Sequence, residues 1–336
     1  MRTAKLDQTD RDLLNLLQSR FPLSRQPFAE LGAALGLDEE EVIERIGRLK
    51  QTRVIRYIGP VFDSRSLGYR STLVAMRIPE ERLERAVRIV NEHPGVSHNY
   101  ARSDALNLWF TLAVPPGSDL KEELQALVAR VDPEEMVDLP AVRLFKIGVF
   151  FDVAGDGRVG GSVPAKPEIT LQPAVALSGS EEAVVRELQR EIPLTARPFD
   201  DMAQRAGVGV DEFLRCCRAL LERGVMRRFG ASLRHHSVGF AANAMVCWRV
   251  PSPMVEEAGR VMSAFSEVSH CYEREASEGW PYNVFAMIHG RTREDCLHTI
   301  TRIAEQTGVE EYRVLFTVKE FKKERVKLVA TTERQT

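Results

Sequence analysis

The sequence predicts an α+β protein built as a tandem duplication, in which each copy is a winged helix-turn-helix followed by a ferredoxin-like βαββαβ domain. Three observations predict this class. Several phrases occur twice at a fixed offset, and within each copy the hydrophobic period changes from helix to strand spacing. A segment rich in glycine and proline separates the two copies.

The duplication is visible in short matching phrases. "VSHNYAR" at 96–102 returns as "VSHCYER" at 268–274, and "FPLSRQPF" at 21–28 returns as "IPLTARPF" at 192–199. In the same way "VIRYIG" at 54–59 matches "VMRRFG" at 225–230, and "LVAMRIP" at 73–79 matches "MVCWRVP" at 245–251. Because the offset between partners is nearly constant, we infer that a whole fold is duplicated.

The first part of each copy predicts three helices and a hairpin. "LDQTDRDLLNLLQSR" has leucines at helical spacing behind an acidic start, and "PFAELGAALG" is a short helix that ends at Gly36. "DEEEVIERIGRLKQT" places Val42, Ile46 and Leu49 on one face, and "VIRYIGPVFD" alternates as a strand does. This is the pattern of a winged helix-turn-helix, expected at 1–62 and 178–233.

The second part of each copy predicts the order βαββαβ. In copy one the strands are expected at 69–78, 95–102, 106–114 and 141–151, and the helices at 79–93 and 118–131. These domains are expected at 63–153 and 234–328, with a linker at 154–177. In a ferredoxin-like sheet the two helices cover one face, so the other face is free to bind a ligand or a partner.

Composition limits the classes of function. The chain has 336 residues, 44 % hydrophobic and 28 % charged, and its formal net charge of −2 gives no general attraction to nucleic acid or an anionic membrane. No run of about 18 apolar residues and no signal peptide is present, so we expect a cytoplasmic protein. The cysteines are odd in number and lack C-x-x-C spacing, which disfavours a zinc site and a disulfide framework. They are Cys216, Cys217, Cys247, Cys271 and Cys296.

The repeated phrase contains the pattern H-x-Y-x-R. Strand alternation places His270, Tyr272 and Arg274 on one face of the sheet, and copy one repeats the pattern as His98, Tyr100 and Arg102. Together these side chains offer a proton donor, a hydroxyl group and a cation. The alternative is that they form only the polar face of a half-exposed sheet.

The longer phrases carry a resemblance. A winged helix followed by βαββαβ resembles the Lrp/AsnC family of transcription factors. "VSHNYARSDALNLWFTLAV" and "RRFGASLRHHSVGFAANAMVCWRVP", with "VSHCYERE" and "WPYNVFAMIHG", are similar to the two subunits of siroheme decarboxylase. Copy one resembles the A-type subunit and copy two the B-type, fused in one chain. The resemblance implies that copy one pairs with copy two, and that the acetate carboxyls at positions 12 and 18 of siroheme are removed to give 12,18-didecarboxysiroheme, in heme b or heme d1 biosynthesis.

Such a reaction defines the side chains to look for. When a carboxylate leaves, electrons flow into the macrocycle and a nearby acid must protonate the new methyl group, so no added cofactor is required. We expect His270 to be the leading acid, and arginines to hold the carboxylates of the substrate. The candidate catalytic residues are His270, Tyr272, His235 and His236. The candidate substrate-binding residues are Arg227, Arg228, Arg234, Arg274, Trp280, Tyr282, Asn283, His98, Tyr100 and Arg102.

Several of these residues have a second interpretation. Arg227 and Arg228 could be surface charges of the wing, and Trp280 and Tyr282, with Trp109 as a counterpart, could be core packing in place of a slot for the macrocycle. His235 and His236 point to opposite sides of an extended chain, so at most one should reach the ligand. His289 and His298 are expected to be structural or solvated. Whether a histidine approaches the siroheme iron stays open.

The copies differ in a way that favours copy two. At the positions of Arg228, His235 and His236, copy one has Tyr57, Ser64 and Arg65. The histidine pair is therefore missing from copy one. We expect a principal site on copy two, which copy one completes or accompanies with a weaker second site.

Two other functions share features with this enzyme. A DNA-binding regulator would need basic residues at the start of its recognition helix, but Asp38, Glu39, Glu40 and Glu41 stand there in copy one, with Asp211 and Glu212 in copy two. No nucleic-acid or membrane partner is therefore expected. A tetrapyrrole sensor without turnover would share the features of the enzyme. Whether two chains form a homodimer stays open.

Overall fold

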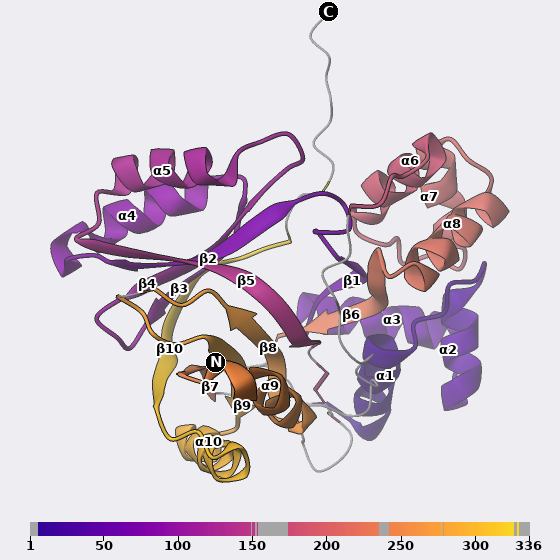
Figure 1. Cartoon of the computed structure of the whole chain (residues 1–336). Helices are drawn as coiled ribbons and strands as arrows, with labels where there is room; N and C mark the ends of the chain where they lie inside the picture. The colour runs from indigo at the N-terminus through magenta and orange to yellow at the C-terminus, as the bar shows by residue number, and fades with distance from the viewer. Residues whose placement is uncertain are drawn as a thin grey trace, which may run out of the picture.

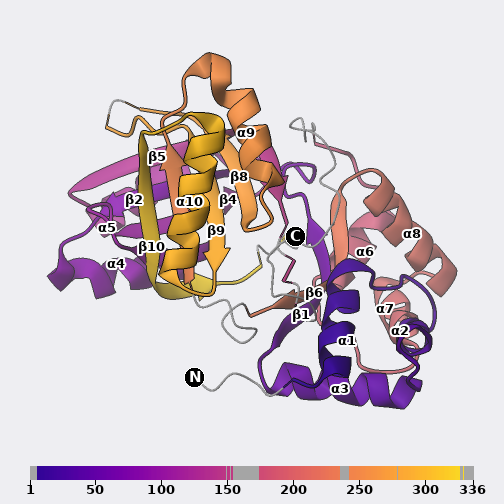
Figure 2. The same cartoon turned by 90° about the horizontal axis from the view of Figure 1, so that it is seen from below.

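The computed structural model describes residues 6–148, 150–151, 153, 174–234, 242–277, 279–325 and 328. Two bodies make up this part of the chain. One is a β-barrel with two helices on each of two sides, and the other is a pair of winged-helix units at one end of the barrel (Figures 1 and 2). Most of the linker, 154–173, lies outside the described residues.

The winged-helix units form where the sequence predicts helices. In copy one these are α1 (Gln8–Ser19), α2 (Pro27–Leu35) and α3 (Glu39–Gln51), followed by β1 (Ile55–Phe62). Copy two repeats them as α6 (Gly179–Leu188), α7 (Pro198–Ala206), α8 (Val210–Glu222) and β6 (Met226–Leu233). Asp7 caps α1 in a reciprocal capping box, and α2 ends at Gly36, whose φ of +70° is the left-handed conformation that glycine adopts without strain.

The prediction of a hairpin within each copy was wrong. Each copy contributes one strand, and β1 pairs antiparallel with β6 of the other copy, with Gly59 opposite Gly230. Alternating side chains predict that a segment is a strand, but they do not specify its partner. The two wings therefore form a single ribbon between the copies.

The two winged-helix units share one hydrophobic core. Buried residues from α1–α3 and from α6–α8 belong to the same cluster, together with Phe229 of β6. Gly230 of β6 lies directly against the end of α1, where an added Cβ would stand 2.5 Å from the carbonyl oxygen of Leu17. The two units therefore pack as one body.

The second domains have the predicted βαββαβ order. Copy one has β2 (Arg70–Arg77), α4 (Glu80–Glu92), β3 (Val96–Arg102), β4 (Leu108–Val114), α5 (Leu120–Val131) and β5 (Glu135–Ile147). Copy two has β7 (Ala242–Trp248), a short 3₁₀ turn (Ser252–Met254), α9 (Val255–Ala264), β8 (Val268–Arg274), β9 (Val284–Gly290), α10 (Arg293–Thr307) and β10 (Tyr312–Lys323). β5 begins several residues earlier than expected.

The last strand of each copy is long because it belongs to both sheets. The first half of β5 pairs with β2 of its own copy, and the second half, from Ala141, pairs with β8 of the other copy. Likewise β10 pairs first with β7 and then, from Thr317, with β3. The eight strands thus close in the order β10-β3-β4-β2-β5-β8-β9-β7, and both sheets find their partner within one chain.

Three apolar layers stabilise the barrel. Residues such as Val74 and Phe110 pack outward against α4 and α5, and Val246 and Ile288 pack outward against α9 and α10. The inner faces meet in a core that includes Trp109, which is 1 % exposed. The two sheet faces that were expected to be free for a ligand therefore pack largely against each other. No helix among the described residues is long and apolar enough to span a membrane.

The close contact between β6 and α1 gives a stability prediction. Replacing Gly230 with alanine forces a methyl group against the backbone of α1, so we expect Gly230→Ala to lower the free energy of unfolding by about 1–3 kcal/mol. Gly179→Ala is the matched control, because its added methyl group meets no atom within 4 Å. Denaturant unfolding of both variants measures the difference, and equal values would contradict the close packing.

Candidate functional site

Two β-bulges shape the centre of the site. The register between β3 and β4 shifts between Val96 and His98, and that between β8 and β9 shifts between Val268 and His270. A bulge inserts one extra residue and re-aims the side chains beside it. Each extra residue is a serine, whose hydroxyl oxygen lies 2.8 Å from Nδ1 of the next histidine, in Ser97–His98 and in Ser269–His270.

From each histidine, a ladder of side chains follows the inner face of the barrel. The rings of His270 and Tyr272 are 6.4 Å apart and nearly parallel, and the guanidinium group of Arg274 lies 5.0 Å from the Tyr272 ring. In copy one the ring centroids of His98 and Tyr100 are 6.3 Å apart. The predicted common face is thus present in both copies, and its side chains are buried or half-buried.

The two histidines lie at the end of the barrel that faces the wings. Nε2 of His98 and of His270 has no hydrogen-bond partner in the described part of the chain. Their charges influence one another, and Lys323 of β10 acts on both rings. Both histidines therefore belong to one site between the barrel and the wings.

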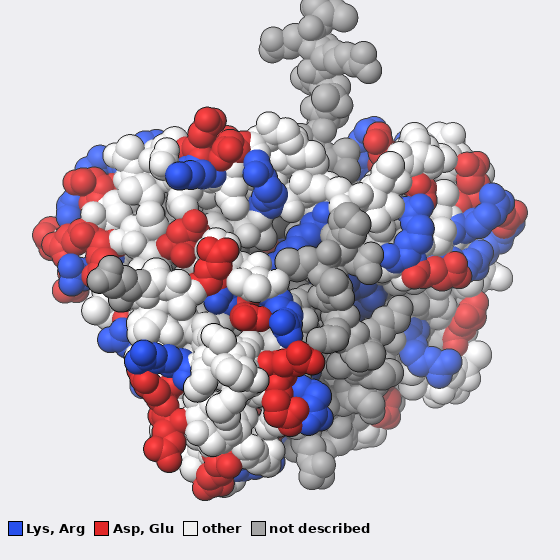
Figure 3. All heavy atoms as spheres, in the orientation of Figure 1, with Lys and Arg blue, Asp and Glu red and all other residues white. Residues whose placement is uncertain are grey.

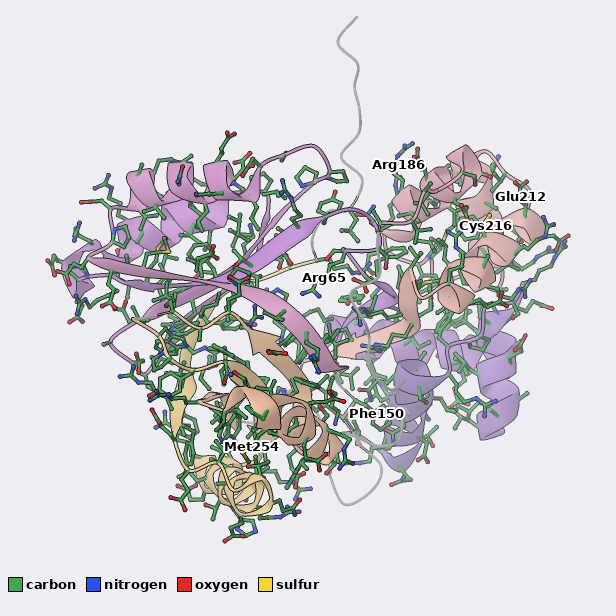
Figure 4. The ribbon with its side chains drawn as sticks, viewed as in Figure 1. Arg65, Phe150, Arg186, Glu212, Cys216 and Met254 are labelled. Atoms are coloured by element: carbon green, nitrogen blue, oxygen red, sulfur yellow. The ribbon has the colours of Figure 1, made fainter. Side chains whose placement is uncertain are left out.

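Basic side chains surround this site; we call the group the basic junction. Arg56 donates to the carbonyl oxygen of Lys323 at 2.8 Å, and the guanidinium group of Arg325 lies 3.4 Å from the centroid of the Tyr57 ring. Figure 4 places Arg65 between the barrel and the wings, and Figure 3 shows basic atoms on the surface there. The basic junction comprises Arg56, Arg65, Arg227, Arg228, Arg234, Lys323 and Arg325.

Within the described residues, few carboxylates balance these charges. Arg227 pairs with Asp63 at 2.6 Å, and Arg56 lies 3.2 Å from Glu320. No hydrogen bond or ion pair to a described residue holds the side chain of Arg65, Arg234 or Lys323. The site therefore suits a ligand with several negative charges.

The wings are unequal at one equivalent position. Asp63 follows β1 and Arg234 follows β6, at matching places in the two copies. On one side the pair Arg227–Asp63 is nearly neutral, whereas on the other Arg56 and Arg234 repel one another, and the pKa of Arg234 is lowered by burial first and then by Arg56. The side that holds His98 therefore offers more unpaired positive charge.

The environment keeps both histidines neutral. Burial first, and then the charge of Lys323, lowers the pKa of His98 to about 3. Burial first, and then the charges of Lys323 and Lys146, lowers the pKa of His270 to about 4. Burial raises the pKa of Tyr100 and of Tyr272 and lowers that of Lys323. An anionic ligand would reverse part of these shifts, because negative charge favours the protonated imidazole.

Some candidate residues lie outside the basic junction. Trp280 is 1 % exposed, and its ring centroid lies 5.4 Å from that of Trp109 and 5.1 Å from that of Tyr282. These contacts agree with the alternative in which the aromatic residues pack the core. The amide of Asn283 bonds both backbone groups of Val250, and so holds a turn.

The arginines of the two ladders are largely committed to the barrel. Arg274 donates to the carbonyl oxygen of Leu139 at 2.7 Å, and Arg102 donates to the hydroxyl oxygen of Thr317 at 2.8 Å. Burial lowers the pKa of each guanidinium group to about 10. The guanidinium group of Arg102 also lies 5.2 Å from the centroid of the Tyr100 ring, as that of Arg274 does at 5.0 Å from the Tyr272 ring.

Arg227 and Arg228 of β6 belong to the basic junction. Arg227 is bound to Asp63, and Arg228 donates to the carbonyl oxygens of Gln18 and Ala231. These contacts disagree with the alternative in which both arginines are solvated charges on the surface of the wing. His235 and His236 lie outside the described residues. Among the described residues, no group of three or more His, Cys, Asp or Glu side chains could hold a metal ion.

Sequence reasoning missed several residues of the site. Ser97 and Ser269 stand in the repeated phrase itself, but a bulge has no sequence signature that would reveal their role. Arg56 also lies in a repeated phrase. Lys323 and Arg325 come from the end of β10 and the residues after it, and reach the site only because β10 crosses to the other copy.

The fold and the site define a protein with Lrp/AsnC-type domains in which a basic, histidine-bearing site lies between the wings and a closed barrel. Family models agree with both parts. The model of the AsnC-like ligand binding domain matches residues 66–146 and 237–322, and that of the siroheme decarboxylase NirDL-like HTH domain matches 10–56 and 181–227.

Known proteins resemble the whole chain. A siroheme decarboxylase of Hydrogenobacter thermophilus is 39 % identical over 94 % of this chain and 93 % of its own length. The siroheme decarboxylase alpha subunit of Desulfovibrio desulfuricans is 44 % identical over 46 % of this chain. The crystal structure of the siroheme decarboxylase NirDL in complex with an iron-uroporphyrin III analogue shares 36 % identity, with a TM-score of 0.71, over 96 % of this chain and 94 % of that one. The chain therefore belongs to the siroheme decarboxylase family, a family of carboxy-lyases, with both subunit types fused.

The lowered pKa values predict how stability changes with pH. Between about pH 4 and pH 6.5 His270 is neutral when folded but takes up a proton when unfolded. The unfolded state then binds more protons, so the free energy of unfolding should fall as the pH falls, by up to about 1.4 kcal/mol per pH unit for each such histidine.

Denaturant unfolding between pH 4.5 and pH 7 measures this slope. We expect a shallower slope in the double variant His98→Asn/His270→Asn. His298→Asn, on the exposed face of α10, is the control and should keep the wild-type slope. Equal slopes in the double variant and the wild type would contradict the neutral state of the two rings.

Proposed function

We propose that this chain removes the acetate carboxyls at positions 12 and 18 of siroheme to give 12,18-didecarboxysiroheme, as a step of heme b or heme d1 biosynthesis. One observation carries the proposal: two histidines, whose Nε2 atoms have no partner among the described residues, face a junction of basic side chains that few of the described carboxylates neutralise. The iron-uroporphyrin analogue in the similar structure is a tetrapyrrole of the same chemical class.

The basic junction explains how such a substrate is held. Siroheme bears up to eight carboxylates, and arginine binds a carboxylate with two parallel hydrogen bonds. Arg65, Arg234 and Lys323 have no competing partner among the described residues, so they are the first choice for this role. Arg227 and Arg228 hold the opposite side, nearer to His270.

The histidines explain the chemistry. When the bond between the methylene carbon and the carboxylate breaks, carbon dioxide leaves and the electron pair passes into the macrocycle. A proton from Nε2 of a histidine then forms the new C–H bond, so each carboxylate lost consumes one proton. We assign this donation to His270 first, with Tyr272 beside it, and to His98 at the second position. The macrocycle accepts the electrons, so no further cofactor is proposed.

The location of the histidines favours one shared site over two separate ones. His270 lowers the pKa of His98, and Lys323 lowers the pKa of both. The substrate would thus present its two acetates to two acids of the same site. Of the two roles expected for copy one, this proposal takes the one in which copy one completes the principal site.

The regulator alternative has little support. The first turn of α3 carries Glu39, Glu40 and Glu41, which repel phosphates. At the start of α8, Asp211 forms a bidentate pair with Arg25 of the other winged-helix unit, and this pair would have to open before DNA could approach. We therefore propose no nucleic-acid partner. A cytoplasmic location also stays our proposal, and a homodimer remains untested.

The first test is anaerobic incubation of the purified chain with siroheme, followed by mass spectrometry. We expect the wild type to lose two carbon dioxide units. His270→Ala and His98→Ala should each slow the loss by about 100-fold or more, because general acid catalysis typically contributes that much. Siroheme bound with unchanged mass would identify a sensor, and absence of binding would reinstate the regulator.

A second test addresses the basic junction. Arg234→Gln removes a cation without a described partner, so we expect KM for siroheme to rise about tenfold, the effect of about 1.4 kcal/mol of lost binding, with a smaller change in kcat. Arg186→Gln, on the exposed face of α6, is the matched control (Figure 4). The assignment of Arg234 to substrate binding fails if both variants have the wild-type KM.

A further inference from the structure

The two histidines have different connections behind them. Ser97 Oγ lies 3.0 Å from the hydroxyl oxygen of Thr111, whereas at the equivalent place in copy two Ser269 Oγ lies 2.8 Å from Nε2 of His289. Ser269 in turn lies 2.8 Å from Nδ1 of His270. Among the described residues, a serine hydroxyl thus connects a second imidazole to His270 but not to His98.

The reaction consumes a proton for each carboxylate that is lost. The inference below therefore rests on the proposed function. A bound tetrapyrrole would cover Nε2 of His270 and separate it from water. If a neutral histidine donates its Nε2 proton, it becomes an anion unless Nδ1 accepts a proton at the same time. The group that contacts Nδ1 therefore decides whether the ring can act as an acid.

We infer that His289 stores this proton and delivers it to His270 through Ser269. His289 starts protonated and gives its Nε2 proton to Ser269 Oγ, while the hydroxyl proton of Ser269 moves to Nδ1 of His270. Nε2 of His270 donates to the methylene carbon as carbon dioxide leaves. His289 and His270 both end neutral, with the proton on Nδ1.

Product release restores the starting state. Water reaches Nε2 of His270 and protonates it, and the Nδ1 proton returns through Ser269 to Nε2 of His289. One proton from solvent is consumed in each cycle, as the loss of one carboxylate requires. No other reactant is needed.

His289 is buried behind Ser269. It lies on β9, and its ring meets the Phe151 ring edge-on at 5.7 Å. Its backbone amide donates to the carbonyl oxygen of Glu267. The carboxylate of Glu267 is bound to Arg302 and to the hydroxyl group of Ser266. The ring is 8 % exposed and its strand neighbour across β7 is Asn243.

The same atoms allow a purely structural reading, so the test must separate the two. The Ser269 hydroxyl could instead donate to the carbonyl oxygen of Met287, but that distance is 3.4 Å, longer than either contact with a histidine. Glutamine at position 289 can still donate a hydrogen bond to Ser269 from Nε2. It cannot hold an extra proton.

The experiment compares His289→Gln with the wild type and with His298→Gln, a matched change on the exposed face of α10. With siroheme as substrate, we expect kcat to fall about 100-fold in His289→Gln while KM changes less than about threefold. Ser269→Ala should lose as much, and the double variant no more, because the two residues act in one chain. Thermal melting and binding of iron-uroporphyrin III confirm that each variant is folded and takes up the macrocycle.

Each outcome decides between the readings. Wild-type kcat in His289→Gln, or a raised KM at unchanged kcat, overturns the relay and leaves His289 a structural residue. If the wild type itself removes no carbon dioxide from siroheme, the proposed function fails, and the relay fails with it. A slow His289→Gln variant beside an active wild type supports both.

Discussion

The exchange of the last strands between the two copies is the constraint on which the rest of the structure depends. Because β5 and β10 each pair with both sheets, neither sheet keeps an open edge there, and the two inner faces meet as a core. The same crossing brings Lys323 opposite His98 and Ile147 opposite His270. The chain thus supplies both members of this sheet pairing from one polypeptide.

The duplication gives the site an approximate two-fold symmetry, and a few substitutions break it. Lys323 stands where copy one has Ile147, Arg234 where copy one has Asp63, and His289 where copy one has Ala113. The first two differences place more positive charge near His98, and the third places a second imidazole behind His270. A substrate with unlike edges can therefore be held in one orientation, although the scaffold is nearly symmetric.

The cations and the imidazoles of the site lie close together, and this closeness disfavours the charged form of each. Burial and the repulsion by neighbouring cations lower the pKa of His98, His270 and Lys323, so the site resists further positive charge. Backbone contacts hold it together instead, as when Arg56 binds the carbonyl oxygen of Lys323 and Arg228 that of Gln18. A polyanion would relieve this repulsion, which makes charge complementarity a source of affinity.

The sequence by itself determined the duplication, the element order and the common face of His270, Tyr272 and Arg274, because these follow from local periodicity. It also indicated the family, through phrases in both copies. Only the tertiary structure decided that β1 pairs with β6, that Trp280 belongs to the core, and that Arg65 and Lys323 join the histidines. Strand partners, bulges and charge clusters depend on contacts between residues far apart in the chain, and local patterns carry no information about them.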